Sequence, residues 1–570
     1  MLAKTHPAYE FRRGQLEMAQ AVEEALAQKR HLIVEAGTGT GKTLAYLVPV
    51  LRSGKRVVIS TGTKTLQEQL FFKDIPFLER EAGLGKLRVC YMKGRNNYLC
   101  RQKLYDLTSQ PVLSGLEEID QYRMIAAWEP ATATGDRAEL KSIPESGALW
   151  PRLDARAEAC SGQKCQQFDR CFITEMRRRA GESDIIIVNH HLFFADLAIR
   201  QLSDRAPDVG ILPEFSAAIF DEAHELEETA PSYFGISVSN LRIEDLARDV
   251  EGSLRAAKLL TEALLGDAAN LRQRAQLFFA TLPPGEGRFA FENRREFLEE
   301  NGDAYSGLLA ALARLSASLQ VLPERPDMVF NLARRAEELR AQLGFLLENE
   351  DRNTVFWIDR RSRNEDRRGR GEARRSPRGE ARRSAGGHIL LQATPIDVSP
   401  ILRQCLFENL EAAVLTSATL AVSGGFEYLR RRLGVDHARE LVVPSHFDYP
   451  RQALLYIPPG LPDPRTPDFP ARASDLVRRV LEVSRGRAFC LFTSYAQMNE
   501  VYTRLLSEVE FPLLLQGTAP KNALLEEFRQ TPGAVLFGTA SFWQGVDVQG
   551  EQLSCVIIDR LPFAVPGDPV

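Results

Sequence analysis

The chain has 570 residues, of which 44% are hydrophobic and 26% charged, and its formal net charge is −4. At roughly 150 residues per domain this length predicts about three to four domains, each able to bury its own core. Such a composition is typical of globular proteins, and the slightly acidic balance excludes a globally basic nucleic-acid binder, so any such site must be a local groove. No apolar run approaches the ~20 residues of a membrane span, and the N-terminus lacks the apolar core of a signal peptide, so we expect a cytoplasmic protein without membrane contact.

The first predicted element is an amphipathic helix within YEFRRGQLEMAQAVEEALAQ. Leu16, Ala19, Val22 and Leu26 recur at helical spacing. Gln15 stands at the start of this helix and could hydrogen-bond an adenine edge. A surface glutamine at a helix start is an equally good interpretation of this residue alone.

A glycine-rich turn, AGTGTGKT at Ala36–Thr43, follows the apolar strand His31–Val34 and precedes a second helical segment. This context favours a phosphate-binding loop over an ordinary turn before a helix. The expected nucleotide-binding residues are Gly37, Thr38, Gly39, Thr40, Gly41, Lys42 and Thr43. Lys42 would reach the β and γ phosphates, and the Thr43 hydroxyl would hold Mg²⁺.

Four of the eight cysteines form a separate pattern after the next strand, Val57–Ile59, and the STGTKT loop. Cys100, Cys160, Cys165 and Cys171 have the spacing C-x59-C-x4-C-x5-C, and the last three stand in a polar segment. Buried core thiols are therefore a poor interpretation, and metal ligation is the better one. Four thiolates suit either zinc or an iron–sulfur cluster, and the absence of C-x2-C pairs favours the cluster.

Two acids, Asp221 and Glu222, directly follow the predicted strand Ala217–Phe220 in the segment DEAH. Asp221 would hold Mg²⁺, and Glu222 would polarise the water that attacks the γ-phosphate. The same segment could instead cap a helix. Beside a phosphate loop the catalytic interpretation is the stronger one.

From about Ser237 to Leu347 the pattern changes to long helical runs, which predict an all-helical insertion. Arg361–Gly387 then holds ten arginines against four acids and repeats RGEARRS, so we expect a disordered segment. A strand at Val414–Leu415 ends in Ser417, Ala418 and Thr419, and a second α/β domain is expected from Leu441 onward.

Taken together, these blocks resemble the DinG/XPD branch of superfamily-2 DNA helicases, and the bacterial DinG-like group in particular. The phosphate loop, STGTKTLQEQL, DEAH, TSATL and GTASFWQGVDVQG occur in the family's order, and the cysteines fall where the family carries a [4Fe–4S] domain. The resemblance implies two RecA-like parallel-sheet domains, the first interrupted by a cluster domain and a helical Arch domain. The implied division is helicase domain 1 at 1–98, 172–235 and 388–440, the cluster domain at 99–171, the Arch at 236–360, the arginine-rich segment at 361–387, and helicase domain 2 at 441–570.

The resemblance also implies a function and further site residues. It implies an ATP- and Mg²⁺-dependent DNA helicase that moves 5′ to 3′ on single strands and unwinds forked DNA in repair or replication, as a monomer. Gln15 matches the adenine-reading glutamine, Ser417 and Thr419 match the motif that couples nucleotide to strand, and His224, Gly545 and Asp547 join the nucleotide site. Tyr91 and Tyr98 could stack on bases, although core packing is the better interpretation of each.

One departure from the family pattern concerns the end of the sequence. No Q-x-x-G-R-x-I-R motif occurs before Val570, whereas the family continues to such a motif and its phosphate-contacting arginines. We therefore expect a C-terminally truncated chain with an incomplete second helicase domain. The alternative to a working helicase is then an ATP- and DNA-binding remnant without turnover.

Overall fold

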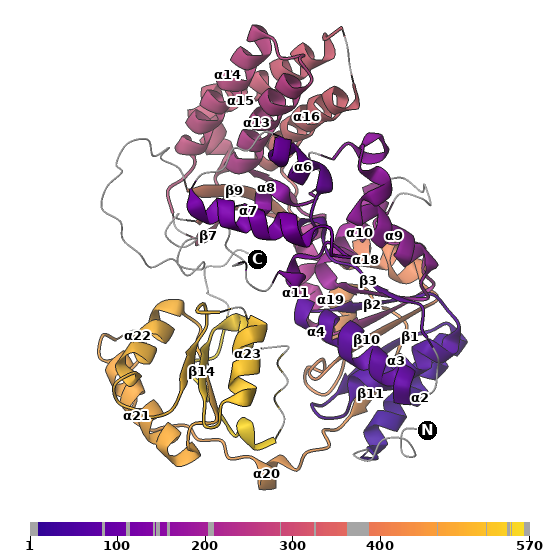
Figure 1. The fold of residues 1–570 in the computed structure, drawn as a ribbon, viewed down its shortest axis with the longest axis vertical. Helices are drawn as coiled ribbons and strands as arrows, with labels where there is room; N and C mark the ends of the chain where they lie inside the picture. The colour runs from indigo at the N-terminus through magenta and orange to yellow at the C-terminus, as the bar shows by residue number, and fades with distance from the viewer. Residues whose placement is uncertain are drawn as a thin grey trace.

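The computed structural model describes most of the chain (Figure 1). The described residues are 10–81, 86–109, 115–140, 143, 149–156, 160–202, 210–285, 287–323, 326–361, 387–463, 466–519, 521–543, 546, 548 and 550–563. Within these ranges no helix is both long enough and apolar enough to cross a membrane. The expected disordered segment at 361–387 falls almost entirely outside the described residues.

A seven-stranded parallel sheet forms the base of the molecule. Its buried strands read as continuous β-branched and apolar runs, which is the pattern expected of a sheet covered on both faces. The spatial order is β11 (Ala438–Val443), β1 (His31–Ala36), β10 (Ala412–Ser417), β5 (Ala217–Asp221), β2 (Val57–Thr61), β4 (Ile185–Asn189) and β3 (Val89–Tyr91). The sheet confirms the expected α/β class.

Helices cover both faces of this sheet and make two separate cores. One core includes Met18, Val22 and Tyr46, and the other includes Phe193 and Leu402. The helices of this domain are α2 (Arg13–Gln28), α3 (Lys42–Ser53), α4 (Lys64–Gln69), α5 (Ile75–Glu81), α9 (Phe172–Glu182), α10 (His190–Leu202), α11 (Leu226–Thr229), α12 (Pro231–Phe234), α18 (Ser399–Cys405) and α19 (Glu427–Leu433). A π-helical turn, Leu70–Asp74, joins α4 to α5.

A small helical unit, which we call the cysteine domain, follows edge strand β3. It contains α6 (Arg101–Ser109), α7 (Leu116–Trp128) and α8 (Trp150–Leu153). Its core is formed by side chains such as Leu104, Ile125 and Trp150, and Phe172 at the start of α9 also packs into it. The unit therefore has its own core, and Ala155, Cys100 and Cys171 also pack against a core of the sheet domain.

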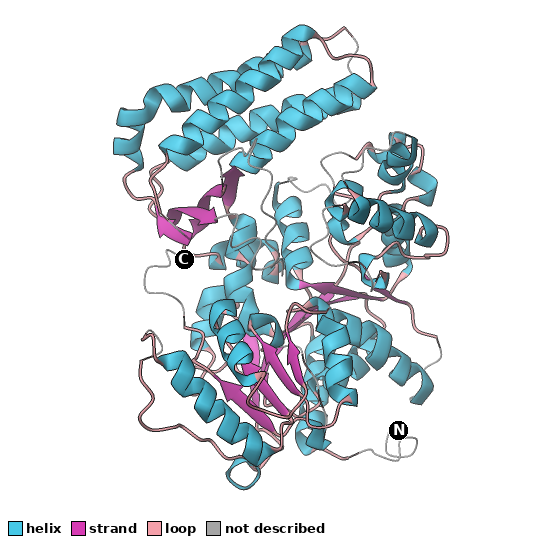
Figure 2. Cartoon of the chain, turned by 60° about the vertical axis from the view of Figure 1, so that its left-hand side comes forward, coloured by secondary structure: helices cyan, strands magenta, loops and turns pink. Residues whose placement is uncertain are grey.

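The insertion expected to be all-helical contains a sheet as well, so that prediction is wrong in part. Four long helices, α13 (Asn240–Ala256), α14 (Glu262–Thr281), α15 (Arg294–Gln320) and α16 (Asp327–Glu348), lie beyond a four-stranded antiparallel sheet (Figure 2). The sheet order is β6 (Ile236–Ser239), β9 (His388–Pro395), β8 (Thr354–Arg361) and β7 (Gly287–Ala290). Strands β6 and β7 have four residues each, too short to show a period-2 pattern beside long helical runs.

Two domain boundaries expected from the sequence also need correction. Strand β9 pairs with β6 and β8 and not with the parallel sheet, so His388–Pro395 belongs to the insertion. Strand β11 pairs with β1 from His31↔Ala438 to Ala36↔Val443, so Leu441–Val443 belongs to the first sheet domain and not to the second. Both errors have one cause, because strand partners distant in sequence leave no local signal.

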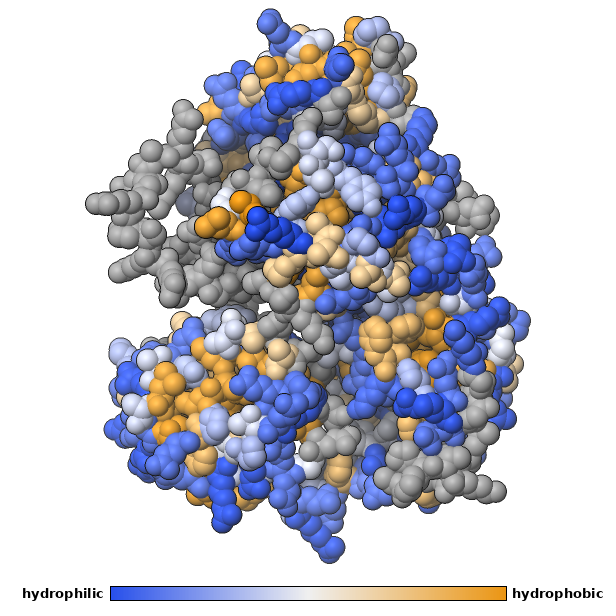
Figure 3. Space-filling view, in the orientation of Figure 1, coloured by the Kyte–Doolittle hydropathy of each residue, from blue (hydrophilic) through white to orange (hydrophobic). Residues whose placement is uncertain are grey.

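The last domain is built on a four-stranded parallel sheet, in the order β13 (Leu513–Leu515), β14 (Val535–Gly538), β12 (Ala488–Leu491), β15 (Cys555–Ile558). Helices α21 (Phe469–Ser484) and α22 (Tyr495–Leu505) pack on one face and α23 (Lys521–Gln530) on the other. A linker with the short helix α20 (Tyr449–Gln452) connects it to β11. Hydrophobic residues gather on the visible face of this domain in Figure 3.

We predict that truncating the core of the insertion destabilises its helices locally. Leu312 in α15 is fully buried, so Leu312→Ala should lower the opening free energy of α14–α16 amides by about 2–5 kcal/mol in native-state hydrogen exchange. Leu265→Ala is the control, because Leu265 on α14 is 42% exposed and should cost about 0.5 kcal/mol or less. Equal effects of the two substitutions would contradict the packing described here.

Candidate functional site: a nucleotide site at the edge of the parallel sheet

The candidate site lies where the parallel strands β1, β10 and β5 end. Since these strands are neighbours and run in one direction, Ala36, Ser417 and Asp221 arrive at the same edge. The carboxyl ends of parallel strands are the usual ligand-binding edge of such sheets. The structure therefore brings together three motifs that are separated by up to 381 positions in the sequence.

The glycine-rich loop has the backbone that its sequence predicts. Gly39 and Gly41 have φ values of +80° and +82°, a region that side-chain-bearing residues rarely adopt. A Cβ on Gly41 would lie 2.2 Å from Gln15 Nε2, and that nitrogen donates a hydrogen bond to the Gly41 carbonyl at 3.1 Å. Helix α3 begins at Lys42, so its N-terminal N–H groups point into the loop.

The side chains of the loop are placed as follows. Thr40 Oγ1 donates to the Gly37 carbonyl at 2.7 Å, which closes the turn. Lys42 Nζ lies 3.4 Å from the Ala36 carbonyl, folded back over the loop. Thr43 is in the first turn of α3, beside Lys42. Gln15, Lys42 and Thr43 thus surround one turn of backbone, as the sequence predicts.

The segment after β11 lies against the other side of the loop, a contact that the sequence analysis missed. The Gly37 N–H donates to the Val443 carbonyl at 3.2 Å, and Ser445 Oγ donates to the Thr38 carbonyl at 3.1 Å. The hydroxyls of Thr38 and Tyr449 are 2.7 Å apart. The start of the linker to the second domain therefore touches the loop directly, and no local motif announces this contact.

The two acids have different environments. Asp221 is buried, and Tyr46 Oη donates to its Oδ2 at 3.0 Å. Burial, with the neighbouring Glu222 carboxylate, raises the pKa of Asp221 to about 6, although Lys42 and the Tyr46 hydrogen bond oppose the shift. Glu222 itself has a left-handed backbone, with φ +58° and ψ +46°, which turns the chain sharply at the sheet edge.

Glu222 is linked to the end of β10 by a short hydrogen-bond chain. Ser417 Oγ donates to Glu222 Oε2 at 3.0 Å, and His224 Nδ1 lies 2.8 Å from the same hydroxyl. Since the serine proton points to Glu222, His224 must carry its proton on Nδ1 to complete the chain. The Thr419 N–H also points to Ser417 Oγ, at 3.5 Å. The predicted Ser417, Thr419 and His224 therefore meet Glu222.

Glu35 is a further polar residue at this edge that the sequence analysis did not identify. Its Oε2 accepts hydrogen bonds from the Leu420 and Ala421 N–H groups, both at 2.6 Å. In the sequence, the one indication of its role is that a glutamate stands in the mostly apolar strand β1. It holds the segment after Thr419 against the strand that leads into the phosphate loop.

His190 is buried behind the site. Its Nδ1 lies 2.7 Å from Ser60 Oγ of strand β2. Burial lowers the pKa of His190 to about 3, so the ring is neutral in the folded protein. The neighbouring His191 is directed elsewhere, and its Nδ1 lies 3.0 Å from the Tyr233 hydroxyl.

The four cysteines lie at the junction between the cysteine domain and α9. Cys100 directly precedes α6, Cys171 directly precedes α9, and Cys165 follows a 3₁₀ turn. Burial raises the pKa of Cys100, and the Cys171 and Cys165 thiols contribute to the increase. Cys160 is exposed; burial disfavours its thiolate, but the Gly162 N–H and Arg95 outweigh this and lower its pKa.

Among the described residues, no group of three histidine, cysteine or acidic side chains is close enough to hold a metal ion. The donor chemistry fits an iron–sulfur cluster, since Cys100, Cys160, Cys165 and Cys171 are all free thiols. The expected nucleotide-binding residues of the second domain, Gly545 and Asp547, lie outside the described residues.

Comparison with known proteins shows that both sheet domains are similar to helicase domains. Residues 17–122 match a family model described as DEAD/DEAH box helicase, and residues 477–570 match one described as helicase C-terminal domain. The chain is 34% identical to the ATP-dependent DNA helicase YoaA of Escherichia coli, over all of this chain and 85% of that protein. It is 31% identical to the ATP-dependent helicase DinG of Mycobacterium tuberculosis, over 98% of this chain and 82% of that protein.

A solved structure titled XPD helicase supports the fold. It superposes with a TM-score of 0.50 at 15% identity, covering 98% of this chain and 86% of that one. At this identity the match concerns the arrangement of elements alone.

We predict that His190 makes the first sheet domain sensitive to acid. Below pH 6.5 the unfolded chain binds a proton at this residue that the folded protein does not bind until about pH 3, so stability falls as the pH drops through this window. Between pH 7 and pH 5 the free energy of unfolding should fall by about 2 kcal/mol through this group. Denaturant titrations should show a smaller fall for His190→Asn.

The matched control for this measurement is His437→Asn, because His437 is exposed. It should show the wild-type dependence on pH. An unchanged dependence in His190→Asn would contradict the buried neutral imidazole.

Proposed function

The chain belongs to the family of ATP-dependent DNA helicases that includes YoaA and DinG, and from this premise we propose that it translocates 5′ to 3′ on single-stranded DNA and unwinds forked duplexes in DNA repair or replication. The enzyme hydrolyses ATP and acts on DNA. The direction of movement, the forked substrate and the cellular pathway are the parts that we propose. A cytoplasmic monomer likewise stays a prediction.

One observation carries the proposal: the catalytic acid is hydrogen-bonded to the motif that follows β10. In this proposal Lys42 would hold the γ-phosphate and Glu222 would polarise the attacking water; the same carboxylate accepts a hydrogen bond from Ser417. Asp221 and Thr43 are the residues that would hold Mg²⁺, which neutralises charge on the phosphates when bound. Any movement of Ser417 must therefore change the water-activating group.

This connection offers a physical route from hydrolysis to movement. The segment that holds Ser417 and Thr419 is tied by its N–H groups to Glu35 on β1, directly before the phosphate loop. The linker to the second domain touches the same loop through Ser445 and Tyr449. The phosphate loop and the catalytic acid would thus be connected by hydrogen bonds to both the coupling segment and the domain linker, as a translocating motor requires.

We further propose that Cys100, Cys160, Cys165 and Cys171 hold a [4Fe–4S] cluster. The supporting features are the four free thiols, the contribution of Cys171 and Cys165 to the raised pKa of Cys100, and the family to which the chain belongs. A bound cluster would cross-link the starts of α6 and α9 to the intervening turns. These residues would then fix the cysteine domain against the motor.

The motor proposal predicts the effect of Glu222→Gln. The amide cannot accept the proton of the attacking water, so DNA-stimulated ATP hydrolysis should fall by about 10²–10⁴-fold while ATP binding is retained. Glu228→Gln is the control, since this exposed glutamate lies in the same segment and touches no site residue. Phosphate release with and without single-stranded DNA measures the effect.

Two outcomes would contradict the motor proposal. Wild-type hydrolysis that DNA does not stimulate would favour the alternative of an ATP- and DNA-binding protein without turnover. Near-normal hydrolysis by Glu222→Gln would show that another group activates the water.

The cluster proposal predicts brown protein with visible absorption after anaerobic purification. Cys165→Ser should bleach the colour and remove iron, whereas Cys405→Ser should not, because Cys405 lies on α18 away from the four ligands. Absorption spectra and iron analysis test this. Colourless protein that contains zinc would refute the iron–sulfur assignment.

A further inference from the structure

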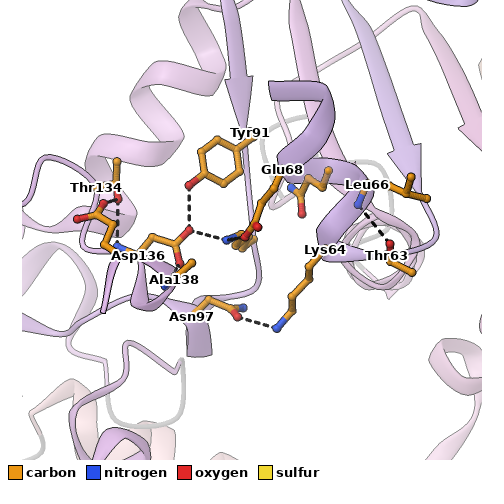
Figure 4. Close-up of polar contacts among 12 residues, drawn as sticks. Thr63, Lys64, Leu66, Glu68, Tyr91, Asn97, Thr134, Asp136 and Ala138 are labelled. Atoms are coloured by element: carbon orange, nitrogen blue, oxygen red, sulfur yellow. Dashed lines mark hydrogen bonds and ion pairs between the residues drawn. The ribbon is translucent and has the colours of Figure 1, made fainter. Parts of the chain in front are cut away.

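A buried ion-pair network joins the cysteine domain to the motor domain at the far edge of the parallel sheet (Figure 4). Its centre is Lys93, two residues beyond β3. Lys93 Nζ lies 2.7 Å from Asp136 Oδ2 in the cysteine domain and 2.8 Å from Glu68 Oε1 on helix α4. One ammonium group thus binds a carboxylate from each of the two domains.

The network is shielded from water. The side chains of Lys93 and Asp136 are 3% and 2% exposed, and that of Glu68 is 24% exposed. Burial opposes the charged lysine, but the two carboxylates outweigh it and raise the pKa of Lys93, so the ammonium stays charged. A buried ion pair adds little stability compared with apolar residues of the same volume, yet it fixes geometry strongly. This favours a role in orientation over one in stability.

Asp136 is held from both sides. Tyr91 Oη, from strand β3, donates to its Oδ2 at 2.9 Å, whereas its Oδ1 accepts from the Ala138 N–H of its own domain at 3.0 Å. Tyr98 is buried, and its hydroxyl accepts from the Lys93 N–H at 3.1 Å. Tyr91 and Tyr98 therefore serve this junction, in agreement with the packing interpretation and not with base stacking.

The same helix that supplies Glu68 begins at the STGTKT loop. Thr63 Oγ1 accepts from the Leu66 N–H and caps α4. Lys64 Nζ donates to Asn97 Oδ1 at 2.8 Å, three residues before Cys100. Helix α4 therefore contacts the segment that leads into the cysteine domain at two residues, Lys93 and Asn97, and it reaches Asp136 of that domain only through Lys93.

We propose that the Lys93–Asp136–Glu68 network is a positioning joint that couples the cysteine domain to helix α4, so that strand contact in one unit is transmitted to the other. The proposal rests on the proposed function, because it takes single-stranded DNA as the ligand. Lys93 and Asp136 are positioning residues, and neither one touches nucleotide. Displacing α4 moves Glu68, and the shared ammonium moves Asp136 with it.

The test compares ATP hydrolysis with and without saturating single-stranded thymidine oligonucleotide in the full chain. Lys93→Met should leave the rate without DNA within about twofold of wild type and lower the DNA stimulation by about fivefold or more. Asp136→Asn should act in the same direction. It retains the shape of the side chain and one acceptor oxygen, which can still accept from the Ala138 N–H, so it serves if Lys93→Met does not fold. Lys55→Met is the control, because Lys55 pairs with Glu411 inside the motor domain, away from the junction.

The outcomes separate the two proposals. Normal stimulation in Lys93→Met and Asp136→Asn, with a stimulated wild type, would overturn the joint and leave the helicase proposal intact. A parallel loss of the basal rate and of thermal stability in Asp136→Asn would also overturn the joint, since it would show a purely structural pair. Absence of stimulation in the wild type would refute the helicase proposal and the joint with it.

Discussion

The structure depends on the parallel alignment of β1, β10 and β5. Parallel pairing brings the phosphate loop, the coupling serine and the two acids to one edge, although they are hundreds of residues apart. The strands are buried on both faces, so their order is fixed by core packing and not by the site. The site residues can then be polar and partly strained, as Glu222 and Asp221 are, because stability is provided elsewhere.

Local motifs predicted the backbone of the phosphate loop and the position of the two acids, because each motif carries its own geometry. Glycine at positions 39 and 41 is required by positive φ, and acids that follow an apolar strand must emerge at the sheet edge. Contacts between distant segments could not be predicted in this way. The linker against Thr38, the Glu35 hydrogen bonds and the Lys93 network each join residues that have no pattern in common.

The fold shows the same division between local and distant signals. The parallel-sheet class followed from strands that alternate with helices, and the expected second α/β domain is present as a four-stranded parallel sheet with helices on both faces. The small antiparallel sheet of the insertion was missed because β6 and β9 are brought together by the intervening helices. Strand β11 was assigned to the wrong domain for the same reason, since only its pairing with β1 shows where it belongs.

The strand order also places the connections to the two neighbouring domains at opposite edges of the motor sheet. Strand β11, which leads to the second helicase domain, is at one edge beside the phosphate loop, whereas β3, which leads to the cysteine domain, is at the opposite edge. A nucleotide at the phosphate loop can act on the domain linker over a short distance, because β11 pairs directly with β1. Communication with the cysteine domain must instead cross the sheet through β5, β2 and β4, or pass along the helix that follows β2. Helix α4 is that helix, and it is connected to the cysteine domain through the buried ammonium group of Lys93. If α4 moved relative to that domain, the carboxylate of Glu68 or Asp136 would lose its partner.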